Sequence, residues 1–193
     1  MKSLSQKLLI FLLFLNCAKD SEIDQSPSVI DSPDTGLSND TSDTDNSFGY
    51  VPCENGMAGI YPCQGYDLLS RVTLEEFNSH TGNDNWGWTD PETGIEYVLN
   101  GLDDGVGFVS IEDPVNPVYL GKLPTATDPS PWRDVKLYNN HAFIVSEAQN
   151  HGLQVFDLTR LRGLTEVQSF TEDAVLNDLG NAHNIAKIGR AHV

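Results

Sequence analysis

Polar side chains that could bind an ion or a ligand gather in short segments next to apolar runs of the chain. The first group, at or before the expected strand starts, comprises Asp84, Trp86, Trp132, Arg133, Asp134, His183 and Asn184. The second group, in segments between apolar runs, comprises Asp103, Asp104, Glu147, Asn150 and His151. Carboxylate and amide oxygens suit a hard cation such as calcium, and an imidazole extends the choice to a transition metal. These residue types therefore allow a divalent cation, provided that the fold brings the two groups together.

Other interpretations of the same residues stay open. Asp134 and Asn184 could hydrogen-bond to loop backbone, as polar residues at strand starts often do. Arg133 could neutralise the carboxylates in a salt-bridged clasp that binds nothing. Catalysis is a third interpretation, although the sequence contains no nucleophile elbow, paired CxxC, HExxH or phosphate-binding loop. The tryptophans are expected to pack rather than to recognise a ligand.

The apolar runs that would position these residues repeat along the chain. "EYVLNGL" (96–102) precedes "GVGFVSIED" (105–113), and "HAFIVSE" (141–147) precedes "GLQVFDLTR" (152–160). "VYLGKL" (118–123) closes the first unit, "EVQSF" (166–170) closes the second, and "NAHNIAK" (181–187) begins a third. An all-β repeat of four strands over about 47–50 residues is typical of a β-propeller blade, with a β-sandwich as the alternative. The sequence predicts blades at 84–123 and 133–170.

Two connections refine this prediction. The turn "EDPVNP" (112–117) contains Pro114 and Pro117, which exclude a helix and predict a turn between the third and fourth strands of the first blade. "LLSRVTL" (68–74) resembles a fourth strand without its own first three, and is expected to pair with the last blade.

Blade topology predicts where the polar groups lie. In an antiparallel unit, the segment before the first strand and the loop between the second and third strands lie on one face. Both groups of candidate residues should therefore share that face, near the propeller axis. The opposite face receives "TDPETG", "YNN" and "EDPVNP", for which only turn chemistry is expected.

The N-terminus predicts an exported, anchored protein. Lys2 and Lys7 precede the apolar run "LLIFLLFL" (8–15), which is too short to span a bilayer and ends at Cys17. Residues 1–17 resemble a bacterial lipoprotein signal with a lipidated Cys17, and an ordinary secretory signal is the alternative. Residues 18–50 are rich in Ser, Asp and Thr and are expected to form a disordered acidic tether. The expected location is the outer membrane or cell surface, with the membrane as a partner through the lipid.

Cysteine count fits that location. The chain has three cysteines, so if Cys17 takes a lipid, Cys53 and Cys63 remain as a pair. A disulfide between them is permitted in an oxidising compartment and would contribute about 2–3 kcal/mol.

Charge narrows the choice of partner. The 193 residues carry 11 basic and 28 acidic side chains, a net charge of −17, which disfavours nucleic acid because an acidic surface repels phosphate backbones.

At the C-terminus, "IGRAHV" (188–193) matches the translation of a common sequencing-library adapter. Residues 187–193 are therefore excluded from functional reasoning, and the chain is expected to be a fragment truncated after about two blades.

Long segments of the sequence resemble the choice-of-anchor B proteins, which contain LVIVD-type repeats. The resemblance covers roughly 53–185 and rests on "CENGMAGIYPC", "GNDNWGWTDPETGIEYVLNGLDDGVGFVSIEDPVNPVYLGKLPT", "WRDVKLYNNHAFIVSEAQNHGLQVFDLTRLR" and "GNAHNI". It implies that 51–186 is the N-terminal part of an exported β-propeller, held to a surface by one of several anchors, and it brings no established reaction. The expected function is a surface-anchored module that binds protein or glycan rather than an enzyme. The alternative is a propeller hydrolase with a metal on the axial face.

Overall fold

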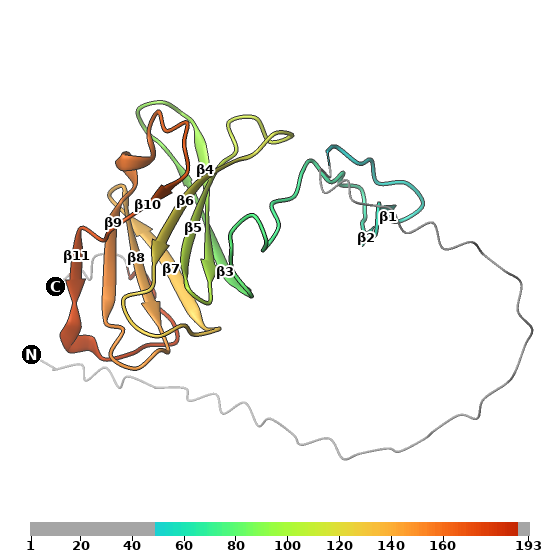
Figure 1. Cartoon of the computed structure of the whole chain (residues 1–193). Helices are drawn as coiled ribbons and strands as arrows, with labels where there is room; N and C mark the ends of the chain where they lie inside the picture. The colour runs from blue at the N-terminus through green and yellow to red at the C-terminus, as the bar shows by residue number, and fades with distance from the viewer. Residues whose placement is uncertain (1–48, 189–193) are drawn as a thin grey trace, which may run out of the picture. The chain divides into compact units, whose positions relative to one another are not determined.

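Two sheets carry the repeat seen in the sequence (Figure 1). The computed structural model describes residues 49–188, which contain strands and two short 3-10 helices, η1 (Leu158–Leu161) and η2 (Asn177–Leu179), but no α-helix. The first sheet consists of β3 (Gly82–Thr89), β4 (Glu96–Leu102), β5 (Gly105–Ser110), β6 (Val118–Pro124) and β10 (Gln168–Ser169). The second sheet consists of β7 (Arg133–Tyr138), β8 (His141–Ser146), β9 (Leu153–Asp157) and β11 (Ala174–Leu176). The all-β prediction is confirmed.

The turn between β5 and β6 forms where the sequence places Pro114 and Pro117. The Asp113 carboxylate accepts hydrogen bonds from the Val115 amide at 3.1 Å and from the Asn116 side chain at 2.8 Å. Proline fixes its own φ and has no N–H, so the strand ends there and an acidic side chain satisfies the turn. The predicted turn between the third and fourth strands is confirmed.

An apolar core lies between the two sheets. Leu99 and Phe108 of the first sheet and Ile144 and Phe156 of the second are fully buried in one cluster. Phe108 stacks on Phe156 with ring centroids 4.7 Å apart, and Phe170 meets both rings at a steep angle. Successive side chains of a strand point to opposite sides, so these residues fix which face of each sheet turns toward the other.

The fourth strand of the second sheet differs from the prediction. β11 occupies that position and pairs antiparallel with β9, whereas residues 166–170 contribute β10, which pairs in parallel with β6 of the first sheet. Gly121 permits this pairing, because its φ is +130° and a Cβ there would lie 1.9 Å from the Gln168 carbonyl oxygen. Phe170 follows directly and packs in the core between the sheets. Burial of this ring draws the segment across to the first sheet, and the prediction of 133–170 as one blade is wrong at its end.

Residues 68–74 do not form the strand that the sequence predicts. The chain instead turns and places Phe77 on the outer face of the first sheet, against Leu102 and Val109. A Cβ at Gly107 would lie 2.7 Å from the Phe77 ring, so the glycine makes room for it. The segment therefore covers a sheet face with side chains instead of extending a sheet edge.

The disulfide between Cys53 and Cys63 is confirmed, with Cα atoms 5.8 Å apart. It closes the loop that carries the short hairpin of β1 (Met57–Ala58) and β2 (Tyr61–Pro62). The signal at 1–17 with its lipidated Cys17, nearly all of the tether at 18–50 and the end of the chain from 189 lie outside the described residues. Between residues 49 and 188, no helix has the length and apolar character to cross a bilayer.

An ion pair joins the two sheets on the face for which only turn chemistry was predicted. Asp90, in the "TDPETG" turn, is fully buried and accepts two hydrogen bonds of 2.7 Å from Arg162, which follows η1. The Glu92 amide and the Thr93 hydroxyl also donate to this carboxylate. The bidentate Arg162 lowers the pKa of Asp90 from 3.8 to about 2.

We predict that Asp90→Asn lowers the melting temperature by roughly 5–10 °C, because a neutral amide cannot replace the carboxylate that accepts two hydrogen bonds from Arg162. The folded pKa is depressed, so Asp90 contributes stability above pH 4 that is lost as the pH falls toward 2. Thermal denaturation from pH 2 to 7 should show a shallower acid loss for Asp90→Asn than for the wild type. Glu92→Gln is the control, since Glu92 meets the same arginine from an exposed position and should change stability little.

Candidate functional site

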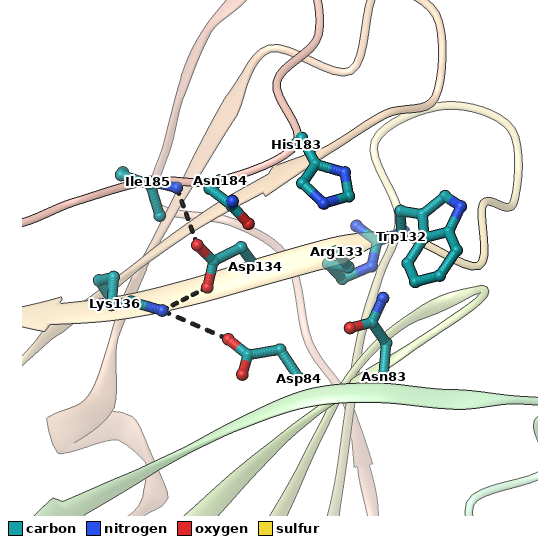
Figure 2. Close-up of a pocket in the computed structure, with 9 residues that line it drawn as sticks. All are labelled: Asn83, Asp84, Trp132, Arg133, Asp134, Lys136, His183, Asn184 and Ile185. Carbon is teal, nitrogen blue, oxygen red and sulfur yellow. Dashed lines mark hydrogen bonds and ion pairs between the residues drawn. The ribbon is translucent and has the colours of Figure 1, made fainter. Parts of the chain in front are cut away.

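A pocket of about 440 Å³ lies where β3 and β7 begin side by side (Figure 2). Its lining consists of Asn83, Asp84, Trp132, Arg133, Asp134, Lys136, His183, Asn184 and Ile185. The structure thus brings together Asp84, Arg133, Asp134, His183 and Asn184 of the predicted site residues. Glu147 reaches this group through His183, while His151 lies outside the lining.

Lys136 organises one end of the pocket, and sequence reasoning missed it. Its ammonium group donates a short hydrogen bond to the Asp134 carboxylate and lies 3.3 Å from Asp84 Oδ2. It also donates to the Val135 carbonyl at 3.0 Å and lies 4.5 Å from the centre of the Trp86 ring. Lys136 follows Asp134 by two residues on one strand, so strand alternation places both on the same face. The spacing of two residues between Asp134 and Lys136 therefore indicates, from the sequence, that Lys136 is the counter-ion.

Asp84 and Asp134 share one cation, so this end of the pocket has two carboxylates for the single ammonium group of Lys136. Burial opposes ionisation of Asp134, but hydrogen bonds from its neighbours, Lys136 and the Ile185 amide among them, lower its pKa. Burial alone would lower the pKa of Lys136, whereas Asp134 and Asp84 together raise it. Asp134 and Lys136 therefore stay charged and bound to each other at neutral pH.

The two carboxylates also tie consecutive repeats together. Asp84 Oδ2 accepts from the Val135 amide at 3.4 Å, and Asp134 Oδ2 accepts from the Ile185 amide at 2.8 Å. In both cases the donor lies 51 residues after the acceptor. Asp134 therefore accepts a hydrogen bond from loop backbone, which is one of the roles expected for a polar residue at a strand start.

Arg133 points away from these carboxylates into the space between the sheets. It is 1% exposed, and its Nε donates to the Leu102 carbonyl at 3.0 Å. One terminal nitrogen donates to the Thr125 hydroxyl at 2.9 Å, and the other lies 2.9 Å from His151 Nε2. Burial lowers the pKa of Arg133 to about 10, so it stays charged at neutral pH. The cation that pairs with Asp134 is Lys136, not Arg133.

His151 is fully buried behind Arg133. Its Nδ1 lies 3.1 Å from the Gly152 carbonyl oxygen, so Nδ1 is the donor and Nε2 accepts from Arg133. Burial lowers the pKa of His151, and the positive charge of Arg133 acts in the same direction. A neutral, buried imidazole with both nitrogens engaged has no atom left for an external ligand.

The other end of the pocket is built from an aromatic ring and polar side chains. Trp132 is 51% exposed, and its ring centroid lies 5.8 Å from that of His183. His183 Nδ1 lies 2.6 Å from Glu147 Oε1, so this nitrogen is committed to the carboxylate. Asn83 donates to the Pro131 carbonyl at 2.6 Å. Figure 2 shows Trp132, His183 and Asn83 grouped at this end, apart from the Lys136 cluster.

The remaining acidic candidates hold the chain that precedes the first sheet. Partial burial opposes ionisation of Asp103, but hydrogen bonds from the Ser79 hydroxyl and the His80 and Thr81 amides lower its pKa to about 2. Asp104 binds Lys122 at 2.6 Å. Asn150 adopts a positive φ of 59° in the loop between β8 and β9. Residues 49–188 contain no cluster of three or more His, Cys, Asp or Glu side chains arranged to hold a metal ion.

Because Lys136 already binds both carboxylates, we expect calcium, zinc and manganese to leave the melting temperature unchanged in calorimetry. Asp134→Ala should lower the free energy of unfolding by about 2 kcal/mol, since Lys136 and the Ile185 amide lose their acceptor. A calcium-dependent rise in melting temperature that Asp134→Ala abolishes would show an ion site instead. Lys136→Met is the matched variant: it leaves two carboxylates without a cation and should create a calcium response.

Comparison with known proteins adds no information on function, so function is inferred from the geometry of this pocket. No protein-family model, no curated protein and no solved structure matches this chain.

Proposed function

We propose that the two sheets are blades of a β-propeller that acts as an anchored, extracytoplasmic binding module with its ligand site in the Trp132 pocket. Each sheet contains four consecutive antiparallel strands, β3 to β6 in the first and β7, β8, β9 and β11 in the second, and their first strands, β3 and β7, lie next to each other. The two equivalent hydrogen bonds that the Asp84 and Asp134 carboxylates accept from backbone amides support the same architecture, because a rotational repeat places equivalent contacts at equal intervals.

The start of a third repeat supports the propeller further. The Ile185 amide donates a hydrogen bond to Asp134 in the same way that the Val135 amide donates one to Asp84. Ile185 and Ala186 also line one pocket with Phe143 and Tyr138 of the second sheet. Residues 181–188 form no strand, and we assign them to the start of a third repeat because Ile185 repeats the contact made by Val135 of β7.

The single observation that carries the binding function is the exposure of Trp132 in a polar pocket. A large apolar ring that is half exposed beside open amide and imidazole groups is typical of recognition sites, where one end of the side chain is apolar and the other wet. At the opposite end, Asp84 and Asp134 both bind the single ammonium group of Lys136. The Trp132 end therefore offers a surface for contact, apart from these charged groups.

A hydrolase is the second candidate, and one contact favours it. Glu147 binds His183 Nδ1 at 2.6 Å, which is how a carboxylate orients a metal-binding or proton-transferring histidine. His183 Nε2 would then face the substrate or a metal. Binding without reaction stays the preferred proposal, because the half-exposed Trp132 ring beside these groups is a contact surface.

The proposed setting is the outer membrane or cell surface. It rests on the apolar run at 8–15, the cysteine that follows it and the acidic segment at 18–50. The partners would be the membrane, through the lipid, and an extracellular protein or glycan, through the pocket. The net charge of −17 argues against nucleic acid.

We predict that Cys17 is acylated. Metabolic labelling of the full chain in a bacterial host with a palmitate analogue should mark the wild type, whereas Cys17→Ser should lose the label and leave the membrane fraction. Cys17→Ser keeps residue size and the rest of the apolar run, so signal recognition itself changes little. Equal labelling of both proteins would rule out the lipid anchor.

We also predict that Trp132→Ala abolishes ligand capture without loss of the fold. The full chain would be applied to immobilised peptide and polysaccharide arrays, and each bound probe tested again with the variant. Tyr138→Ala is the matched control, since Tyr138 is a similarly exposed aromatic, 54% exposed, on the same strand region but outside this pocket. A bound probe that Trp132→Ala does not affect would place the site elsewhere, and no bound probe on either array would contradict a binding module.

A further inference from the structure

We infer that the ligand of the Trp132 pocket is a neutral carbohydrate, with one sugar ring stacked on Trp132 and its hydroxyl groups bound by Asn83, His183 and Asn184. This inference rests on the proposed binding function and specifies the chemical class of the ligand. It also reverses the expectation that the tryptophans only pack, at least for Trp132.

The backbone around Trp132 holds the ring in place before any ligand arrives. The Trp132 amide donates to the Ser130 hydroxyl at 3.2 Å. The Trp132 carbonyl accepts from the Ser146 hydroxyl at 3.0 Å and from the Glu147 amide at 3.2 Å. These bonds fix the backbone from which the ring projects, and stacking of a ligand on the ring removes its apolar surface from water. The C–H face of a pyranose ring is flat and apolar and suits such a platform.

Three polar side chains of the pocket have hydrogen-bonding capacity to spare: Asn83 and His183 at the Trp132 end, and Asn184 nearer to Asp134 (Figure 2). Asn83 uses its amide nitrogen on Pro131, and His183 uses Nδ1 on Glu147. Within residues 49–188, no hydrogen bond engages Asn83 Oδ1, His183 Nε2 or the side-chain amide of Asn184. These atoms supply both donors and acceptors. Sugar hydroxyl groups are donors and acceptors at once, so they match this mixture better than a purely donating or accepting ligand.

The charges around the pocket argue against an anionic ligand. An anion would need a free cation, but Lys136 is shared by two carboxylates and the Arg133 guanidinium lies buried between the sheets. The excess negative charge of Asp84 and Asp134 over Lys136 lies at the Lys136 end, whereas the Trp132 end offers the amide of Asn83 and the imidazole of His183, to which Glu147 is bound. A neutral ligand matches the groups at the Trp132 end. The volume of about 440 Å³ lies within the range of small-ligand sites.

The test is a titration of the full chain with neutral oligosaccharides of glucose, galactose, mannose and N-acetylglucosamine, and with uronic-acid oligosaccharides as acidic counterparts, followed by tryptophan fluorescence and calorimetry. We expect at least one neutral sugar to bind, with an affinity that changes little between about 50 and 300 mM salt, because a neutral ligand makes no screened ion pair. Trp132→Ala should weaken binding about tenfold or more, and Trp132→Phe should retain most of it.

The controls separate a lost contact from a lost fold. Tyr138→Ala should bind like the wild type, and the melting temperature of each variant reports its folding. If Trp132→Ala does not fold, Asn184→Ala decides, because its exposed amide lines the pocket and should weaken sugar binding several-fold.

Each outcome bears on the inference. Preference for acidic sugars with strong salt dependence would overturn the neutral class. Sugar binding that neither Trp132→Ala nor Asn184→Ala affects would overturn the site. If peptides bind at Trp132 and sugars do not, the inference fails while the proposed binding function stands. If neither class binds, both fail.

Discussion

Both large sheets have apolar residues on two faces, and the need to cover these faces determines how the chain runs. Phe77 covers the outer face of the first sheet, and Phe108 and Phe156 fill the space between the sheets. The face of the second sheet turned away from the core meets Ile185 and Ala186. Burial of apolar surface is the dominant favourable contribution to folding, but it has no direction and does not by itself set how two sheets are aligned.

Alignment comes from polar contacts at the two ends of the interface between the sheets. At one end, Arg133 is buried and binds the Leu102 carbonyl of the first sheet, while Asp84 accepts from the Val135 amide. At the other end, Asp90 and Arg162 form a bidentate pair across the same interface. Such groups are costly to bury without partners, so a shift of one sheet relative to the other would leave several of them unsatisfied. The apolar core supplies stability, and these contacts restrict it to one arrangement.

Local patterns in the sequence were sufficient for much of the fold. Alternating apolar residues predicted the strands of both sheets, the prolines at 114 and 117 predicted a turn, and cysteine count predicted the disulfide. These features depend on residues close together in sequence. The end of the second unit failed because two segments, 168–169 and 174–176, compete for a strand position. Which segment takes the position depends on where Phe170 can be buried, and a local pattern in the sequence does not contain that information.

The candidate site shows the same division between local and distant information. Positions at the expected strand starts included Asp84, Asp134 and His183 of the pocket lining, whereas Trp86 from the same group and His151 from the loops lie outside the lining. Their roles depended on charge pairing, and the sequence offered two cations close to Asp134. Strand alternation separates them: Lys136 shares a face with Asp134, and Arg133 lies on the other face. Strand alternation alone therefore assigns Lys136 as the counter-ion of Asp134.

Asp90 and Arg162 could not have been paired by any such rule, because they lie 72 residues apart in separate turns. Their contact exists only once both sheets are formed and stacked. The sequence does show that each is a charged residue in a turn, which is the usual place for a solvated side chain. Full burial of Asp90 is therefore a property of the assembled interface and not of its turn.

The contacts of Asp84 and Asp134 also bear on where the pocket is open. Each carboxylate accepts from a backbone amide 51 residues later, and the two together hold Lys136 between them. Arg133, directly before Asp134, turns its guanidinium into the space between the sheets, where it donates to the Leu102 carbonyl. Since successive side chains of an extended chain point to opposite sides, burial of Arg133 leaves its neighbour Trp132 on the exposed side. The buried cation that helps to align the two sheets is therefore next to the exposed aromatic ring on which the proposed ligand rests.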